Sequence, residues 1–74
     1  MVYLFTQDGE TCTLFDGNKE VYISNNKITM TNHGSYMTST LAKYNSKEEC
    51  EKAMKLFYKR LNLGATVFQF PKEI

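Results

Sequence analysis

The hydrophobic period of the chain changes once, at Ser46, and this change limits the folds that the chain can adopt. Before Ser46, short runs rich in threonine, β-branched and aromatic residues alternate between two faces, which is typical of β-strands. After Ser46, apolar residues recur at intervals of three and four residues, which is typical of one face of a helix. The sequence therefore predicts several strands followed by one amphipathic helix.

The strand region divides into five predicted strands that are separated by turn residues. The predicted strands span residues 2–7, 11–15, 20–24, 27–31 and 36–43. Asp8-Gly9 and Asn25-Asn26 stand between consecutive strands, and such pairs accept the positive φ angles of tight hairpin turns. Short turns between successive strands favour an antiparallel meander, in which each strand pairs with the next.

The predicted helix has a recognisable start and end. Ser46 and Glu49 form a capping-box pattern. In such a pattern the serine hydroxyl accepts the backbone N–H of the glutamate, and the glutamate side chain accepts the backbone N–H of the serine. Gly64 is expected to end the helix near Asn62. The predicted buried face consists of Cys50, Ala53, Met54, Phe57 and Leu61. A last short strand is predicted at residues 66–70.

These elements predict a single α+β domain over residues 1–74. Its expected form is an antiparallel five-stranded meander sheet, packed by one C-terminal amphipathic helix and followed by a short final strand. A domain of this size buries only about 60% of the surface that its unfolded chain exposes. Self-association would bury more apolar surface, so a homodimer is one of the partners that the sequence leaves open.

Composition predicts a reducing compartment and no membrane partner. Cys12 and Cys50 lie far apart in the chain, whereas secreted domains this small usually carry four or more cysteines. No signal-peptide pattern occurs in the first strand region, and no apolar run approaches the roughly 18 residues that cross a bilayer. The expected location is the cytoplasm.

The residue types that usually carry catalysis are few and scattered. His33 precedes a glycine in a predicted turn, where its tolerance of unusual φ angles gives it a conformational role. Its spacing to Cys12 and Cys50 matches no zinc pattern, and the glycines stand singly rather than in a phosphate-binding loop. Cys50 lies on the apolar helix face, which favours packing over nucleophilic chemistry. We therefore expect a protein that is not an enzyme and that needs no cofactor or metal.

Aromatic residues are too numerous for one side of a small sheet. Residues 2–5 are apolar on both faces, as in a strand that is covered on both sides. The candidate protein interface consists of Tyr3, Phe5, Tyr22 and Tyr36, some of which alternation places opposite the helix, among threonines. Such a face is either a stabilising set of cross-strand pairs or an interface, because tyrosine serves both roles. Stacking of unpaired bases is a third use, although the net charge is only +1.

The basic side of the predicted helix is a second candidate surface. The candidate polyanion contacts are Lys52, Lys55, Lys59 and Arg60. The helix dipole favours positive charge near the end of a helix, so these residues form either a solvated face or a contact for nucleic acid or an acidic protein. A domain that binds phosphate backbones usually carries a strong basic excess, so nucleic acid is the less favoured partner.

Two segments, residues 2–9 (VYLFTQDG) and 43–53 (KYNSKEECEKA), resemble a group of small proteins from low-GC Gram-positive bacteria and their phages. Those proteins begin with a strand that ends in T-Q-D-G, continue as a meander, and enter one helix through a tyrosine and a capping box. The chain departs from them at residues 13–17, where they often have Asn-Leu-Asp-Asn. The resemblance implies a phage or mobile-element origin and the cytoplasm of a bacterial host cell.

Small phage proteins often act by covering a host protein, including nucleases of defence systems, and the resemblance implies a role of that kind. The sequence-based hypothesis is a protein-binding module that acts through the aromatic sheet face or a strand edge. Its specific form is inhibition of a bacterial defence system such as a CRISPR nuclease. The alternative hypothesis is an accessory protein that binds nucleic acid through the basic helix face.

Overall fold

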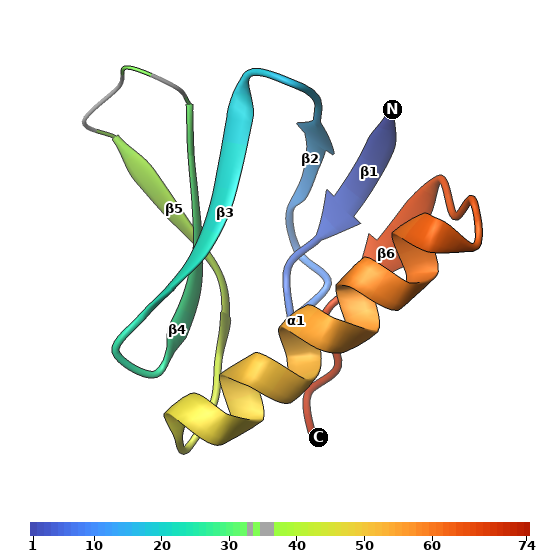
Figure 1. The fold of residues 1–74 in the computed structure, drawn as a ribbon. Coiled ribbons are helices and arrows are strands. Elements are labelled where there is room, and N and C mark those ends of the chain that lie inside the picture. The colour runs from blue at the N-terminus through green and yellow to red at the C-terminus, as the bar shows by residue number, and fades with distance from the viewer. Residues whose placement is uncertain (33, 35–36) are drawn as a thin grey trace.

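The computed structural model describes residues 1–32, 34 and 37–74, and this part of the chain forms six strands and one helix (Figure 1). The elements are β1 (Val2–Phe5), β2 (Cys12–Phe15), β3 (Lys19–Ser24), β4 (Lys27–Asn32), β5 (Thr38–Lys43), α1 (Lys47–Asn62) and β6 (Val67–Gln69). The α+β class predicted from the sequence is confirmed. His33 and Tyr36, which the sequence analysis singled out, lie outside the described residues.

The strands form two three-stranded sheets, so the prediction of one five-stranded meander sheet is wrong. Sheet A has the strand order β2-β1-β6, and sheet B has the order β3-β4-β5. Within sheet A, β1 pairs antiparallel with β2 and parallel with β6. Sheet B is antiparallel throughout. The predicted final strand is therefore part of sheet A, where it pairs with β1 on the side opposite β2.

The chain leaves sheet A through a turn that is closed by a side chain. The carboxylate of Asp16 accepts the N–H of Asn18 at 2.9 Å, and its carbonyl oxygen accepts the N–H of Lys19 at 3.2 Å. β2 and β3 follow one another across this turn but do not pair, so the predicted meander divides between them into two sheets.

Gln7 joins the two sheets. Its backbone N–H donates to the carbonyl oxygen of Leu41 at 2.8 Å, and its side-chain Oε1 accepts the N–H of Lys43 at 3.0 Å. Its Nε2 donates to the carbonyl oxygens of Pro71 and Lys72, each at 3.3 Å. One glutamine thus ties sheet A to β5 and to the segment that follows β6.

Sheet B contains a break in register that the predicted alternation does not include. The pairing of β4 with β5 shifts between Ile28 and Thr29, whose partners are Ala42 and Thr40. Leu41 lies between those partners, and Leu41 and Ala42 are both buried although they are neighbours in the chain. Strict alternation along β5 is therefore wrong at this position.

The helix α1 agrees with the sequence prediction at both ends. Ser46 is the N-cap, and its hydroxyl accepts the N–H of Glu49 at 3.2 Å. The carboxylate of Glu49 accepts the N–H of Asn45 at 3.2 Å, which is one residue before the position that a capping box uses. Gly64 has a φ of 83°, and two N–H groups beyond the last turn donate back into it. This arrangement is a Schellman motif, which explains why the helix ends at Asn62.

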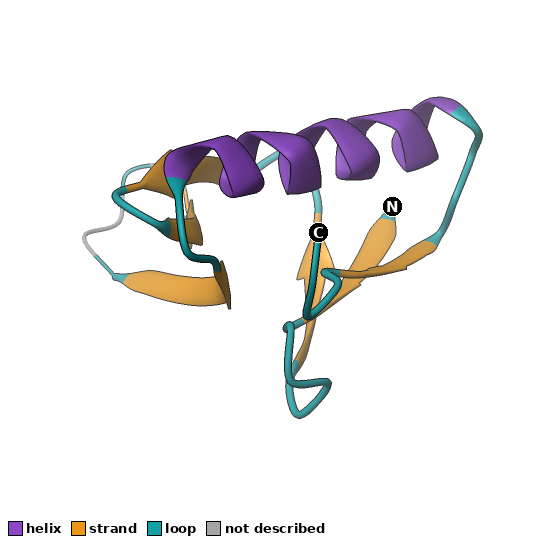
Figure 2. Ribbon diagram, turned by 90° about the horizontal axis from the view of Figure 1, so that it is seen from below, coloured by secondary structure: helices purple, strands orange, loops and turns teal. Residues whose placement is uncertain are grey.

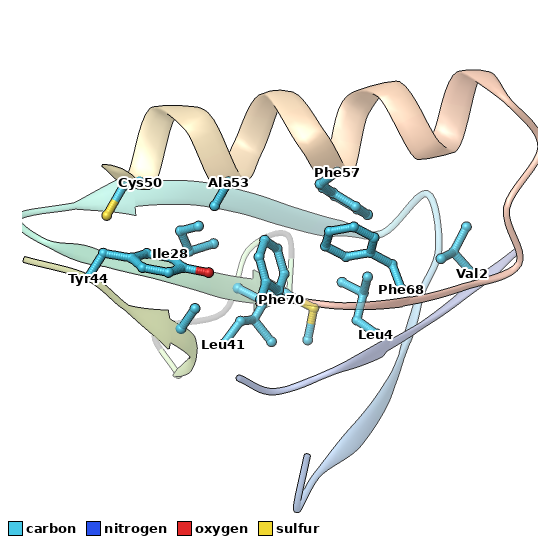
Figure 3. Packing of buried hydrophobic residues seen from close by; sticks show 12 residues of the cluster. Val2, Leu4, Ile28, Leu41, Tyr44, Cys50, Ala53, Phe57, Phe68 and Phe70 are labelled. Carbon is cyan, nitrogen blue, oxygen red and sulfur yellow. The ribbon is translucent and has the colours of Figure 1, made fainter. Parts of the chain in front are cut away.

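The core lies between α1 and the inner faces of the two sheets (Figure 2). Ala53 and Phe57 point from the helix toward Phe68 and Phe70, and the ring centroid of Phe57 is 5.2 Å from that of Phe68 (Figure 3). The buried hydrophobic residues are Val2, Leu4, Ile28, Met30, Leu41, Ala42, Tyr44, Cys50, Ala53, Phe57, Phe68 and Phe70. Burial of a large side chain of this kind contributes about 1.5 to 3 kcal/mol. One helix therefore serves both sheets, from their inner side.

Candidate functional site

The outer face of sheet A carries two rows of side chains that cross all three strands. Residues that are opposite in register point to the same face of a sheet. The register of β1 with β2 and β6 gives the rows Leu14–Tyr3–Val67 and Cys12–Phe5–Gln69. The parallel pairing of β6 with β1 is what extends each row to a third strand.

Alternation along the strands separates this face from the core. Val2 and Leu4 are buried, whereas Tyr3 between them is 48% exposed. On β6, Phe68 is buried and its neighbour Val67 is 55% exposed. The outer face of sheet A is therefore in contact with solvent, although most of its side chains are apolar.

The two rows contain no charged side chain. Met1 is the next outward position along β1 and is 82% exposed. It borders an open hollow of about 440 Å³ that is lined by Met1, Val2, Phe15, Asp16, Gly17 and Lys19. Single exposed apolar residues are normal on protein surfaces, whereas contiguous ones are typical of binding sites. Met1 and the six residues of the two rows are called the sheet A patch below.

The outer face of sheet B has a different chemistry. The register places Tyr22, Thr29 and Thr40 in one row. Thr29 is only 6% exposed, and Tyr22 is partly buried. A tyrosine packed among threonines in this way suits the stabilising cross-strand role that the sequence analysis left open. A role of Tyr22 in an interface stays a prediction.

The structure brings together two of the four residues that the sequence predicted as a protein interface. Tyr3 and Phe5 lie in the sheet A patch. Tyr22 belongs to sheet B, and Tyr36 lies outside the described residues. The predicted interface is therefore divided, and its sheet A half is the part with exposed apolar neighbours.

Sequence reasoning missed the members of the patch that β2 and β6 supply. Val67 and Gln69 alternate with Phe68 and Phe70, and this period of two indicates that the last strand has a second face. No sequence signal shows that β6 pairs with β1, because parallel strands are not joined by a short turn of characteristic composition.

The side chains of the T-Q-D-G segment, residues 6–9, stabilise the turn between β1 and β2. The carboxylate of Asp8 accepts the hydroxyl of Thr6 and the N–H of Glu10, and these hydrogen bonds hold the pKa of Asp8 below its ordinary value. Gly9 has a φ of 75°, which a residue with a side chain rarely adopts. Together with the bonds of Gln7, these contacts make the segment a connector between the sheets.

The two cysteines occupy opposite environments. Cys12 is exposed within the sheet A patch, whereas Cys50 is fully buried on the core-facing side of α1. Burial raises the pKa of the Cys50 thiol, so this side chain is protonated and serves packing. Among residues 1–32, 34 and 37–74, no group of three His, Cys, Asp or Glu side chains is placed to hold a metal ion. Because the Cys12 thiol is free and exposed, its reactivity reports whether the sheet A patch is covered.

The four predicted polyanion contacts lie on the solvent side of α1. Lys52, Lys55, Lys59 and Arg60 are all exposed, and none of them forms an ion pair within the described part of the chain. The helix lies on the inner side of the sheets, so this basic side and the sheet A patch face different directions (Figure 2). The molecule thus has two separate candidate surfaces. Binding of nucleic acid at the basic side stays a prediction.

Comparison with known proteins gives no match, either among protein families, among curated proteins or among solved structures. The helix α1 has 16 residues, and no helix within the described residues is long and apolar enough to cross a membrane. The exposed surfaces of the fold are therefore the basis for a functional assignment.

Proposed function

We propose that the protein is a small protein-binding module that binds its partner through the sheet A patch. The observation that supports this proposal is the contiguity of uncharged side chains on that face. Met1, Tyr3 and Val67 are 82%, 48% and 55% exposed, and the register joins the last two in one row. Interface centres are depleted of charge and enriched in tyrosine and methionine, and the patch has the same composition.

Burial of the patch by a partner would remove apolar surface from water. This transfer contributes about 25 cal/mol for each Å² of apolar surface. The polar outer face of sheet B offers less apolar surface for this purpose.

A more specific form of the proposal is inhibition of a bacterial defence nuclease by a phage-encoded protein. Its support is the resemblance of residues 2–9 and 43–53 to small proteins of Gram-positive bacteria and their phages. Plating of phage on strains with and without a given defence system, each expressing the protein, tests it. Restored plating in the defended strain is the expected result, and unchanged protection across the tested systems would count against it.

The test of the binding proposal uses the native thiols. The tagged protein captures partners from a bacterial lysate, and the complex is then treated with an alkylating reagent. A partner on the sheet A patch should slow alkylation of Cys12, whereas Cys50 is unreactive in both the free and the bound protein because it is buried. Mass spectrometry of the two cysteine peptides measures both rates.

Matched variants locate the contact. The double variant Tyr3→Thr/Val67→Thr removes exposed apolar surface and leaves a β-branched residue, which strands favour, at both positions. It should weaken capture by about tenfold or more, because central apolar residues of interfaces often contribute more than 1 kcal/mol each. Tyr22→Thr makes the same tyrosine-to-threonine change on sheet B and should have little effect on capture. Equal capture by the wild type and the sheet A double variant, both folded by circular dichroism, would contradict the proposal.

A further inference from the structure

Charge is divided unevenly along the chain. Residues 1–51 carry seven carboxylates and four lysines, a net charge of −3, whereas residues 52–74 carry five cations and one carboxylate, a net charge of +4. The overall charge of +1 hides this separation. The boundary falls inside α1. Its first turns contain Glu48, Glu49 and Glu51, whereas its later turns contain cations and no carboxylate.

Three of the lysines after this boundary share one exposed side of the helix. Lys52, Lys55 and Lys59 are spaced by three and four residues, so they form a stripe about 10 Å long that is directed away from buried Ala53 and Phe57. The helix dipole favours cations only within the last turn, so it accounts for Lys59 and not for Lys52 and Lys55. Lys52 and Lys55 stand four residues after Glu48 and Glu51, a spacing that supports a helix. None of the three lysines forms an ion pair within the described part of the chain, so their charge is open to a partner.

A tyrosine accompanies the stripe. Tyr58 lies between Lys55 and Lys59 in the chain and is 67% exposed. An exposed aromatic ring beside cations offers both apolar contact area and hydrogen bonding to a partner. Glu48 and Glu51 lie on the same exposed side, one turn toward the helix start. Along the exposed side of α1, acidic side chains therefore come first and are followed by lysines and a tyrosine.

From this pattern we infer that the exposed side of α1 binds an acidic segment of a partner protein. The segment carries three or four carboxylates over about two helical turns, opposite the lysine stripe, and a cation opposite Glu48 and Glu51. This surface is separate from the sheet A patch, so the inference does not rest on the proposed function. A partner that engages both surfaces would have to wrap around the domain, so each surface is tested by itself.

Three observations favour a protein segment over nucleic acid. The stripe is only about 10 Å long, which is enough for two or three successive phosphates. Beyond it, a phosphate backbone would run along the carboxylates of Glu48 and Glu51, which repel it. The net charge of +1 lacks the basic excess of domains that bind phosphate backbones. A protein segment with charges of both signs meets none of these obstacles.

The test is an NMR titration of the isotope-labelled protein with two probes. The first is a synthetic alanine-rich helical peptide with four glutamates on one half and two lysines on the other. The second is an oligothymidine that spans the same length. The peptide should shift the backbone amides of residues 52–60, and its affinity should fall about tenfold between about 50 mM and about 300 mM salt, because salt screens exposed charges. The oligothymidine should bind more weakly than the peptide.

Two triple variants separate the stripe from general positive charge. Lys52→Gln/Lys55→Gln/Lys59→Gln should weaken peptide binding by about tenfold or more. Lys27→Gln/Lys43→Gln/Lys47→Gln removes the same charge from exposed positions elsewhere and should change affinity less than about threefold. The inference is overturned if the peptide causes no shifts, if both variants lose affinity equally, or if the shifts centre outside α1. Tighter binding of the oligothymidine at the same lysines would also overturn it, in favour of a nucleic-acid surface.

Discussion

The carbonyl oxygen of Pro71 accepts two hydrogen bonds, and this arrangement predicts a non-additive loss of stability. The hydroxyl of Tyr44 donates to it at 2.6 Å, and Nε2 of Gln7 donates to it at 3.3 Å. The perturbation is a double-mutant cycle of Tyr44→Phe and Gln7→Met. Each substitution removes one donor and keeps the size of the side chain similar.

The expected magnitudes follow from the partners that each substitution removes. Tyr44→Phe should lower the free energy of unfolding by about 1 kcal/mol, because the carbonyl keeps its second donor. Gln7→Met should cost about 1 to 3 kcal/mol, because it also removes the bonds to Lys43 and Lys72. The double variant leaves the Pro71 carbonyl without either donor next to a buried ring. A further loss of about 1 kcal/mol beyond the sum is therefore expected.

Urea unfolding followed by circular dichroism measures all four proteins of the cycle. A domain of this length has a total stability of roughly 4 to 11 kcal/mol, so an interaction of about 1 kcal/mol is measurable. Losses that add to within about 0.3 kcal/mol would refute the shared-acceptor reasoning. The control cycle pairs Gln7→Met with Tyr58→Phe, which removes the hydroxyl of an exposed tyrosine on the other side of the core, and should be additive.

Two further predictions test backbone conformation and ionisation. Gly64→Ala should cost about 1 to 2 kcal/mol in urea unfolding, because φ is 83° there, whereas Gly17→Ala, where added atoms meet open space and φ is not positive, should be neutral or stabilising by up to about 1 kcal/mol. Burial raises the pKa of Tyr44 to about 12 from an ordinary value of 10.0. The folded state therefore keeps this hydroxyl protonated where the unfolded chain ionises it, so stability should fall by up to about 1.4 kcal/mol per pH unit between pH of about 10 and 12. Alkaline unfolding of Tyr44→Phe should lack this component, and an identical pH dependence of the two proteins would contradict the assignment.

The sequence predicted the parts of the fold that neighbouring residues determine. The cap at Ser46 and the end of the helix at Gly64 depend on hydrogen bonds within one turn, and both were predicted. The turn at Asn25 follows from the tolerance of asparagine for positive φ, and its φ is 56°. Such features are encoded within four or five residues, so a local pattern is sufficient to predict them.

The arrangement of the strands depends on contacts between distant residues, which local patterns do not encode. The parallel pairing of β6 with β1 joins the two ends of the chain, and no turn signal accompanies it. The link between the sheets depends on one glutamine whose side chain bonds to the backbone of β5. A meander is the simplest arrangement that the turns permit. The long-range bonds stabilise two three-stranded sheets instead.

The candidate interface shows where a local pattern and the observed burial disagree. Residues 2–5 are apolar on both faces, which predicts a strand covered on both sides, yet the structure buries Val2 and Leu4 and leaves Tyr3 between them 48% exposed. In sheet B, by contrast, Tyr22 lies in one row with Thr29 and Thr40 and is partly buried, so pattern and burial agree there. Sequences depart from local consistency mainly at functional positions. The case for an interface therefore rests on the exposure of Tyr3 beside uncharged neighbours such as Val67, and not on the number of aromatic residues. It would lose its basis if another part of the same chain were found to cover the face.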